Sequence, residues 1–126
     1  MIAAFVDTSV LVAISFQEDG CAEVAARLQE FDAVFGSDLL EAELRSACAR
    51  EQRDVDTRLF DQVRFIYQPR SLRAEFIQVL GAGYLRGADC FHLAVALSLT
   101  ASPKELTFLT LDERQRNVAA ALGFAT

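Results

Sequence analysis

The first residues of the chain constrain its fold more than any other segment. Ile2–Val6 is a continuous apolar run that ends at Asp7. A strand with one face in water alternates apolar and polar residues, whereas a strand covered on both faces is apolar throughout. We therefore expect Ile2–Val6 to be an interior strand of a parallel sheet.

The rest of the chain alternates helical periodicity with short apolar runs. The patterns predict helices from Thr8 or Ser9 to Ile14, Cys21 to Phe31, Ser37 or Asp38 to Gln52, Asp54 to Phe65, Ser71 to Leu80, Asp89 (after breaks at Gly81, Gly83 and Gly87) to Leu99 and Glu113 to Leu122, and strands at Val34–Phe35, Ile66–Gln68 and Leu106–Leu111. Such alternation is typical of parallel strands joined by helices. We expect an α/β fold, an α/β/α sandwich with a short parallel sheet, in a single domain over residues 1–126.

The charge limits how the protein can bind its ligands. The net charge is −6, and eleven of the twelve basic residues are arginine, because Lys104 is the single lysine. An acidic protein is poorly suited to grip nucleic acid along a broad basic face. Carboxylates that hold divalent cations nevertheless reverse the potential locally. A nucleic-acid ligand is therefore compatible only with a confined, cation-bearing site.

No segment has the pattern of a targeting or membrane sequence. The run before Asp7 is too short for a secretory signal, and the apolar stretch His92–Ala101 has about half of the ~20 residues that a membrane helix needs. Cys21, Cys48 and Cys90 lack the spacing of a zinc or redox motif, so we expect free thiols that fill the core. We expect a soluble, cytoplasmic protein without a membrane span.

Four acidic residues lie where a parallel sheet would bring them together. Asp7 and Asp112 each follow an expected strand, Asp89 is expected to open a helix, and Glu43 lies one turn inside another helix. Ligands bind at the carboxyl ends of parallel strands, and four neighbouring carboxylates need a cation to stay ionised. Oxygen ligands favour Mg²⁺ or Mn²⁺, whose chemistry with phosphates is hydrolytic. For any one of these acids alone, a role as helix cap or turn residue is the commoner explanation.

Five segments, in order along the chain, resemble those of PIN-domain ribonucleases. They are Phe5-Val6-Asp7-Thr8-Ser9-Val10-Leu11, Ala42-Glu43-Leu44 followed by Ser46-Ala47, Asp89-Cys90-Phe91-His92-Leu93-Ala94, Phe108-Leu109-Thr110-Leu111-Asp112, and the closing Ala121-Leu122-Gly123-Phe124. Each segment alone is weak, but the ordered set spans almost the whole chain. Length and the lack of further domains favour the VapC branch, the toxins of type II toxin–antitoxin pairs.

The resemblance implies an activity, a metal site and partners. It implies that Asp7, Glu43, Asp89 and Asp112 are the catalytic, metal-binding residues for one or two Mg²⁺ or Mn²⁺ ions. The expected reaction is cleavage of single-stranded or looped RNA that leaves a 3′-hydroxyl and a 5′-phosphate. The branch also implies a small antitoxin bound across the active-site groove, and a homodimer formed by helical faces. Phe31, Phe60 and Phe65 are candidates for those faces, and equally for the core.

Further residues are candidates for supporting roles. Thr8, Ser9, Thr110 and His92 can orient the acids or their metal-bound waters, and each has an alternative structural explanation. Arg86, Arg114 and Arg116 can meet substrate phosphates, although each can equally be solvated surface. Glu41 lies roughly 200° around the helix from Glu43, so the two cannot face one ion. Glu113 follows Asp112 directly and could serve as an additional ligand.

Two other classes of protein remain as alternatives. A phosphohydrolase could use Asp7 as a nucleophile, but it would need a second Asp two residues later and a nearby Lys, whereas position 9 is Ser and the chain has only Lys104. An inactive PIN-like scaffold for RNA or protein would be marked by a broken acidic set. A housekeeping role in RNA processing is a third alternative within the nuclease interpretation, and an adjacent antitoxin-like reading frame would distinguish it from a toxin.

Overall fold

A computed structural model describes residues 1–126 and contains a four-stranded parallel sheet. The strands are β1 (Ala3–Val6), β2 (Ala33–Ser37), β3 (Arg64–Ile66) and β4 (Leu106–Leu109). Their order across the sheet is β3-β2-β1-β4, so β1 lies between two neighbours. The prediction of an interior first strand is confirmed.

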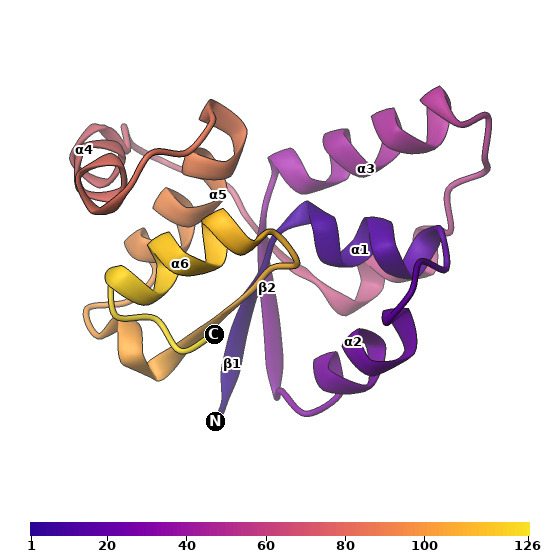
Figure 1. Ribbon diagram of the computed structural model, residues 1–126, viewed down its shortest axis with the longest axis horizontal. Coiled ribbons are helices and arrows are strands. Elements are labelled where there is room, and N and C mark those ends of the chain that lie inside the picture. Colours follow the sequence, from indigo (N-terminus) through magenta and orange to yellow (C-terminus); the bar gives the residue numbers. More distant parts are fainter.

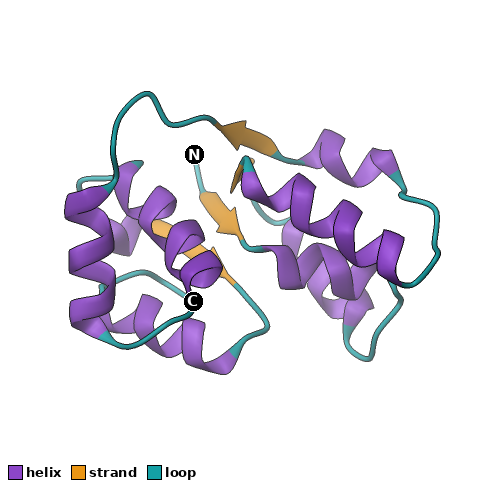
Figure 2. Cartoon of the chain, turned by 90° about the horizontal axis from the view of Figure 1, so that it is seen from above, coloured by secondary structure: helices purple, strands orange, loops and turns teal.

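Helices cover both faces of this sheet. They are α1 (Thr8–Ser15), α2 (Cys21–Leu28), α3 (Leu39–Arg50), α4 (Arg73–Ala82), α5 (Gly87–Ser98) and α6 (Glu113–Ala121), with short 3₁₀ turns η1 (Thr57–Gln62) and η2 (Pro103–Glu105). Figure 1 shows α1, α2 and α3 on one side of the strands and α4, α5 and α6 on the other. The view from above shows the same two groups of helices with the strands between them (Figure 2). The predicted α/β/α sandwich is confirmed.

The sheet divides the interior into two apolar clusters. Phe5 of β1 stacks on Phe108 of β4, with ring centroids 5.8 Å apart, on the side of α4–α6. Ala4 and Val6 point to the other side, where they join Leu40 among the side chains of α1 and α3. Successive side chains of β1 point to opposite faces of the sheet, and both faces are covered by helices. The strand must therefore be apolar throughout, as its sequence is. Burial of each large side chain contributes about 1.5–3 kcal/mol.

Several predicted element boundaries were wrong. The expected helix from Asp54 to Phe65 is instead η1 followed by β3, because Arg64–Ile66 pairs with the end of β2. This pairing satisfies the backbone of a segment whose β-branched Val63 and Ile66 favour a strand. In addition, α2 ends at Leu28, three residues before Phe31.

The expected helix start at Asp89 was also wrong. Arg86 has an extended backbone and precedes the first turn, so α5 begins at Gly87 and Asp89 is its third residue. Gly87 is the first residue of α5 and so lies outside the helix interior, where glycine costs about 1 kcal/mol. Gly81, which was also expected to interrupt the helical pattern, lies inside α4 and does not end that helix.

Two further expectations concern the cysteines and membranes. Cys48 and Cys90 are buried, Cys21 is half-buried, and all three are free thiols, as predicted. None of the helices is long and apolar enough to cross a membrane.

Candidate active site

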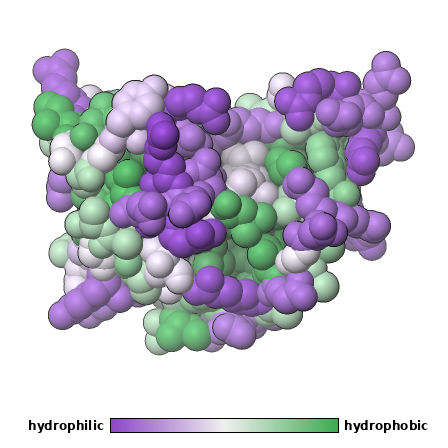
Figure 3. Space-filling model, viewed as in Figure 1, coloured by the Kyte–Doolittle hydropathy of each residue, from purple (hydrophilic) through white to green (hydrophobic).

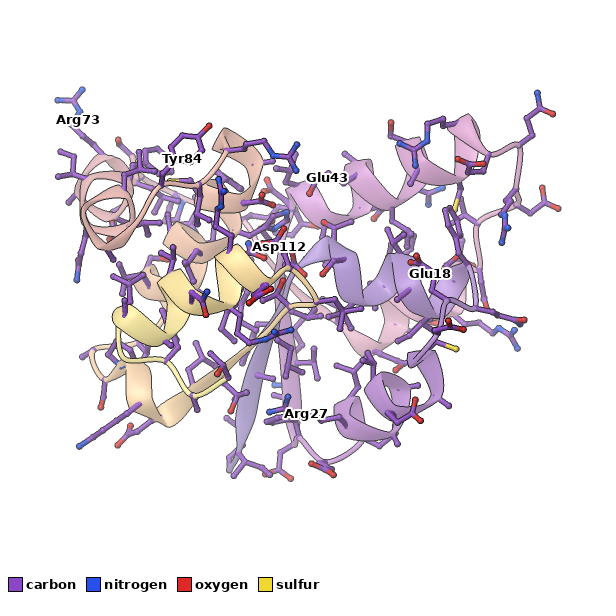
Figure 4. The ribbon with its side chains drawn as sticks, viewed as in Figure 1. Glu18, Arg27, Glu43, Arg73, Tyr84 and Asp112 are labelled. Atoms are coloured by element: carbon purple, nitrogen blue, oxygen red, sulfur yellow. The ribbon has the colours of Figure 1, made fainter.

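Two neighbouring strands place two of the predicted acids at one end of the sheet. Asp7 follows β1 directly, and its backbone N–H donates to the Leu109 carbonyl at 3.1 Å. Asp112 comes three residues after Leu109 and begins α6. Figure 4 shows Asp112 and Glu43 near the same end of the sheet, in the space between the two helix layers. Asp89 of α5 lines the same hollow as Asp112. The four predicted acids therefore come from four separate elements to one region.

Asp7 is held by the helix that follows it. Its Oδ1 accepts hydrogen bonds from the backbone N–H of Ser9 at 3.2 Å and from the Ser9 hydroxyl at 2.6 Å. The side chain is buried, and this desolvation raises the pKa of Asp7 from 3.8 to about 6, despite the hydrogen bond from Ser9 and the nearby His92. The charge of Asp89 raises the pKa further. Asp7 is thus a carboxylate whose negative charge the protein alone stabilises poorly.

Asp112 is the N-cap residue of α6. Its Oδ1 accepts from the backbone N–H of Gln115 at 2.8 Å, and its own N–H donates to the Thr110 hydroxyl at 3.0 Å. The buried Gln115 accepts from the Thr110 hydroxyl at 2.7 Å and donates to the Asp89 carbonyl at 3.1 Å. Gln115 therefore ties the end of β4 to the starts of both α5 and α6. The second oxygen of Asp112 makes no hydrogen bond or ion pair within the protein.

Glu43 is oriented by a chain of polar residues. The Thr8 hydroxyl donates to Glu43 Oε1 at 2.7 Å, and Nε2 of the buried His92 forms a short hydrogen bond with the same oxygen. The hydrogen bond from His92 is the main cause that lowers the pKa of Glu43, so this carboxylate is ionised. On the far side of the ring, Ser37 Oγ lies 2.8 Å from His92 Nδ1. A neutral ring that donates from Nε2 can accept from Ser37 through Nδ1.

Asp89 is only weakly compensated. Arg86 Nε lies 3.9 Å from Asp89 Oδ2, at the limit of an ion pair. Desolvation, followed by the charge of Asp112, raises the pKa of Asp89, and Glu43 adds to the rise. Arg86 and His92 oppose it without reversing it. The negative charges of Asp112 and Glu43 therefore repel that of Asp89 in this region.

The donor set fits a hard divalent cation by its chemistry. The donors are oxygen atoms: carboxylates dominate the set, and His92 is occupied by Glu43, Thr8 and Ser37. Raised pKa values at Asp7 and Asp89 are what a bound cation would relieve. As the side chains stand, however, no group of three His, Cys, Asp or Glu residues is close enough to hold an ion. Binding of one ion by all four acids would therefore require their carboxylates to move closer together.

A comparison with known protein families matches residues 4–121 to the PIN domain. The chain belongs to the PIN domain family. PIN domains are generally nucleases that bind nucleic acid, and they usually use divalent metal ions. The matched range contains all four acids. A search of curated proteins finds no match to this chain.

The three arginines predicted to meet phosphates have different positions in this PIN domain. Arg86 and Arg114 line the hollow that contains Asp89 and Asp112. Arg116 instead donates to the Thr110 carbonyl at 2.9 Å, which supports the turn before α6. Glu113, the possible additional ligand, is exposed and makes no hydrogen bond or ion pair. Glu41 pairs with Arg45 at 2.6 Å, away from Glu43.

Three residues of the site were missed from the sequence. Ser37 positions His92, and no local pattern marks it because its partner is 55 residues away. Gln115 could have been found from the spacing Asp112-Glu113-Arg114-Gln115, which matches a capping box, although its side chain bonds elsewhere. Tyr84 lines the arginine-bearing hollow, and only its position near Arg86 gives a signal.

Proposed function

We propose that this PIN domain is a Mg²⁺- or Mn²⁺-dependent endoribonuclease that acts as the cytoplasmic toxin of a type II toxin–antitoxin pair. One observation carries the proposal: four acids, from the end of β1, from α3, from α5 and from the β4–α6 turn, lie in one region at the carboxyl end of the sheet, where open parallel sheets bind ligands. Burial, followed by the charges of Asp112 and Glu43, raises the pKa of Asp89, which supports a cation as the missing partner.

The reaction that we propose is hydrolysis of a phosphodiester bond. Water adds to phosphorus, the bond from phosphorus to the 3′ oxygen breaks, and this oxygen takes a proton, which leaves a 3′-hydroxyl and a 5′-phosphate. Asp7, Glu43, Asp89 and Asp112 would hold the cation, which when bound would activate water and offset charge on the phosphate.

The other polar residues would keep the carboxylates in place. Ser9 fixes Asp7 through two hydrogen bonds, and Thr8 with His92 fixes Glu43. Such support lowers the entropy that each ligand loses on binding, and its removal typically weakens metal affinity or activity by about 10- to 100-fold. Thr110 acts more indirectly, through the turn that presents Asp112.

We further propose that a small antitoxin covers this region and that the protein forms a homodimer. An acidic cleft favours a basic side chain from the antitoxin. For the dimer, Ile77 and Leu80 of α4 are 70% and 47% exposed, and Figure 3 shows apolar surface over this helix. By contrast, the predicted Phe31, Phe60 and Phe65 are half-buried against the core. Light scattering of purified protein, with Ile77→Asp as a disrupting variant, tests the dimer.

The experiment that tests the nuclease compares two glutamates on one helix. Labelled single-stranded RNA is incubated with partner-free protein and Mg²⁺ or Mn²⁺, with an EDTA control. We expect Glu43→Gln to lose cleavage and Glu41→Gln to retain it, because the Glu41–Arg45 ion pair is exposed and contributes little. Calorimetry with Mn²⁺ measures metal binding in the same proteins.

The outcomes separate the candidate functions. Metal-dependent cleavage lost only in Glu43→Gln supports the nuclease. No cleavage of varied RNAs together with no Mn²⁺ binding would exclude it in favour of an inactive scaffold. Growth arrest on expression in bacteria, relieved by co-expression of a small neighbouring reading frame, would distinguish a toxin from a housekeeping enzyme.

A further inference from the structure

We propose that Tyr84, Arg86 and Arg114 form a nucleotide-binding pocket in which an RNA base stacks on the Tyr84 ring. The pocket would hold a nucleotide next to the scissile phosphate and so position the substrate. This inference rests on the proposed ribonuclease function, and it adds a binding element that the acidic residues alone do not provide.

The pocket is a hollow directly beside the acids. It has a volume of about 400 Å³ and is lined by Tyr84, Leu85, Arg86, Asp89, Asp112 and Arg114. This volume lies within the roughly 300–1,000 Å³ typical of small-ligand sites. Asp89 and Asp112 are among the residues that line it, so a nucleotide in the hollow would lie next to the proposed cleavage site.

Tyr84 offers an aromatic face to the solvent. It lies in the loop between α4 and α5 and is 67% exposed. The guanidinium of Arg114 lies over the ring, 5.8 Å from its centroid. In Figure 4, Tyr84 lies at the upper left and Asp112 lies nearer the centre of the molecule. An exposed ring next to basic side chains is the usual arrangement for stacking of single-stranded bases, which is sequence-tolerant because every base has a π-face.

Arg86 and Arg114 supply positive charge where a phosphate would sit. Their planar guanidinium groups can each donate two hydrogen bonds to phosphate oxygens. Arg86 is 82% exposed and only weakly paired with Asp89, so it is free to turn toward a ligand. The surface between the starts of α5 and α6 is correspondingly hydrophilic in Figure 3.

A second hollow on the other side of Asp112 is less suitable for RNA. It is lined by Ser9, Val12, Ala13, Glu18, Asp19, Leu111 and Asp112. Glu18 and Asp19 would repel a phosphate, and no basic side chain is present there. The contrast in charge assigns the nucleotide to the hollow with Tyr84.

The loop that carries Tyr84 is anchored on both sides of it. Leu85 is 4% exposed within the core cluster under α5. Gly83 packs so closely on α6 that an added Cβ would lie 2.8 Å from a methyl group of Val118. The loop therefore holds Tyr84 close to Arg114 before any ligand arrives, which reduces the entropic cost of stacking.

The test uses the fluorescence of Tyr84 itself. The chain has no Trp and two Tyr residues, so Tyr67→Phe leaves Tyr84 as the single strong emitter. In a Glu43→Gln background, which keeps the RNA intact, the protein is titrated in Mg²⁺ with short single-stranded RNA of mixed sequence. The same backbone without bases is the ligand control, and Tyr84→Phe with Tyr67 retained is the protein control. Emission is corrected for absorption by the RNA.

We expect RNA to quench Tyr84 emission, and expect no quenching with the abasic backbone or in Tyr84→Phe. In parallel, anisotropy of labelled RNA should show about 5- to 150-fold weaker binding for Tyr84→Ala. Tyr84→Phe should bind like the parent, because its ring is retained. Tyr67→Ala should also bind like the parent, because β3, which precedes Tyr67, lies at the opposite edge of the sheet from β4.

Failure of this inference differs from failure of the nuclease proposal. If RNA binds and is cut, but Tyr84 emission and the affinity of Tyr84→Ala do not change, the pocket is refuted while the nuclease stands. If wild-type protein neither binds nor cuts RNA, both proposals fail. Quenching by a co-purified protein partner but not by RNA would reassign the pocket to a protein contact and overturn the inference.

Discussion

Replacement of Asp7 by asparagine should make the metal-free protein more stable. Asp7 is buried, and desolvation is the main cause that raises its pKa from 3.8 to about 6. Between these values the folded protein binds a proton that the unfolded chain releases. The free energy of unfolding therefore falls as the pH rises through this window. Above the window, the full loss caused by the buried charge is present. Asparagine has no charge to desolvate, and its side-chain oxygen can still accept from Ser9.

The magnitude follows from the pKa shift. A rise of about two units, at 1.36 kcal/mol per unit, is a penalty of roughly 3 kcal/mol at about pH 7. For a domain of this size, we expect a gain of about 10 °C in Tm. Near pH 4 the carboxyl is protonated in the folded protein and about half-protonated in the unfolded chain, so the gain should shrink below about 1 kcal/mol.

The assay is urea unfolding followed by circular dichroism, in EDTA, at about pH 7 and about pH 4. Asp38→Asn is the matched control, because Asp38 precedes α3, is exposed and caps nothing; its effect should stay within about 0.5 kcal/mol. With saturating Mg²⁺, wild type should regain about 2–3 kcal/mol and Asp7→Asn should gain little. A destabilised Asp7→Asn protein in EDTA at about pH 7 would refute the argument, since the Ser9 hydrogen bonds would then outweigh desolvation.

Four further substitutions test the packing and the polar contacts. Ser37→Ala removes the partner of Nδ1 in the buried His92, so we expect a loss of about 1–3 kcal/mol in urea unfolding and slower RNA cleavage. Gly81→Ala should raise the free energy of unfolding by about 0.5–1 kcal/mol, and with it Tm, because an added Cβ in α4 meets nothing within 4 Å. Gly83→Ala should lower Tm, because its Cβ would lie 2.8 Å from an α6 side chain. Gln115→Leu should cost about 2 kcal/mol and weaken Mn²⁺ binding in calorimetry, because it removes two buried hydrogen bonds.

The sequence correctly predicted those elements whose residue pattern is visible within one short segment. Ile2–Val6 is apolar because both of its faces are covered, and this is visible in the sequence. The strand predicted at Ile66–Gln68 shares only Ile66 with β3, and Arg64 and Phe65 were mistaken for helix because their conformation depends on pairing with β2, some 30 residues earlier. The start of α5 at Gly87 was missed for a related reason: a glycine is a poor helix former in the interior but costs little at the first turn.

Part of the candidate site could likewise be predicted from the sequence, and part of it could not. The region of the acids could be predicted from Asp7 and Asp112, because strand ends in a parallel sheet are necessarily neighbours when the strands pair. The chain Ser37–His92–Glu43 could not be predicted, since it joins three elements far apart in the sequence and depends on how α3 and α5 pack. Periodicity predicts which face of a helix is buried, but not which side chain it meets.

Capping and metal binding, which compete as explanations of Asp112 in the sequence, are compatible in the structure. One carboxylate oxygen of Asp112 accepts from Gln115 N–H, and the other is free. Asp112→Asn should therefore keep the cap and lose RNA cleavage, whereas Asp112→Ala should lose both, with about 1 kcal/mol lower stability than the asparagine variant in urea unfolding. Equal stabilities would show that the cap contributes nothing, and cleavage by Asp112→Asn would show that the free oxygen is not needed as an anion.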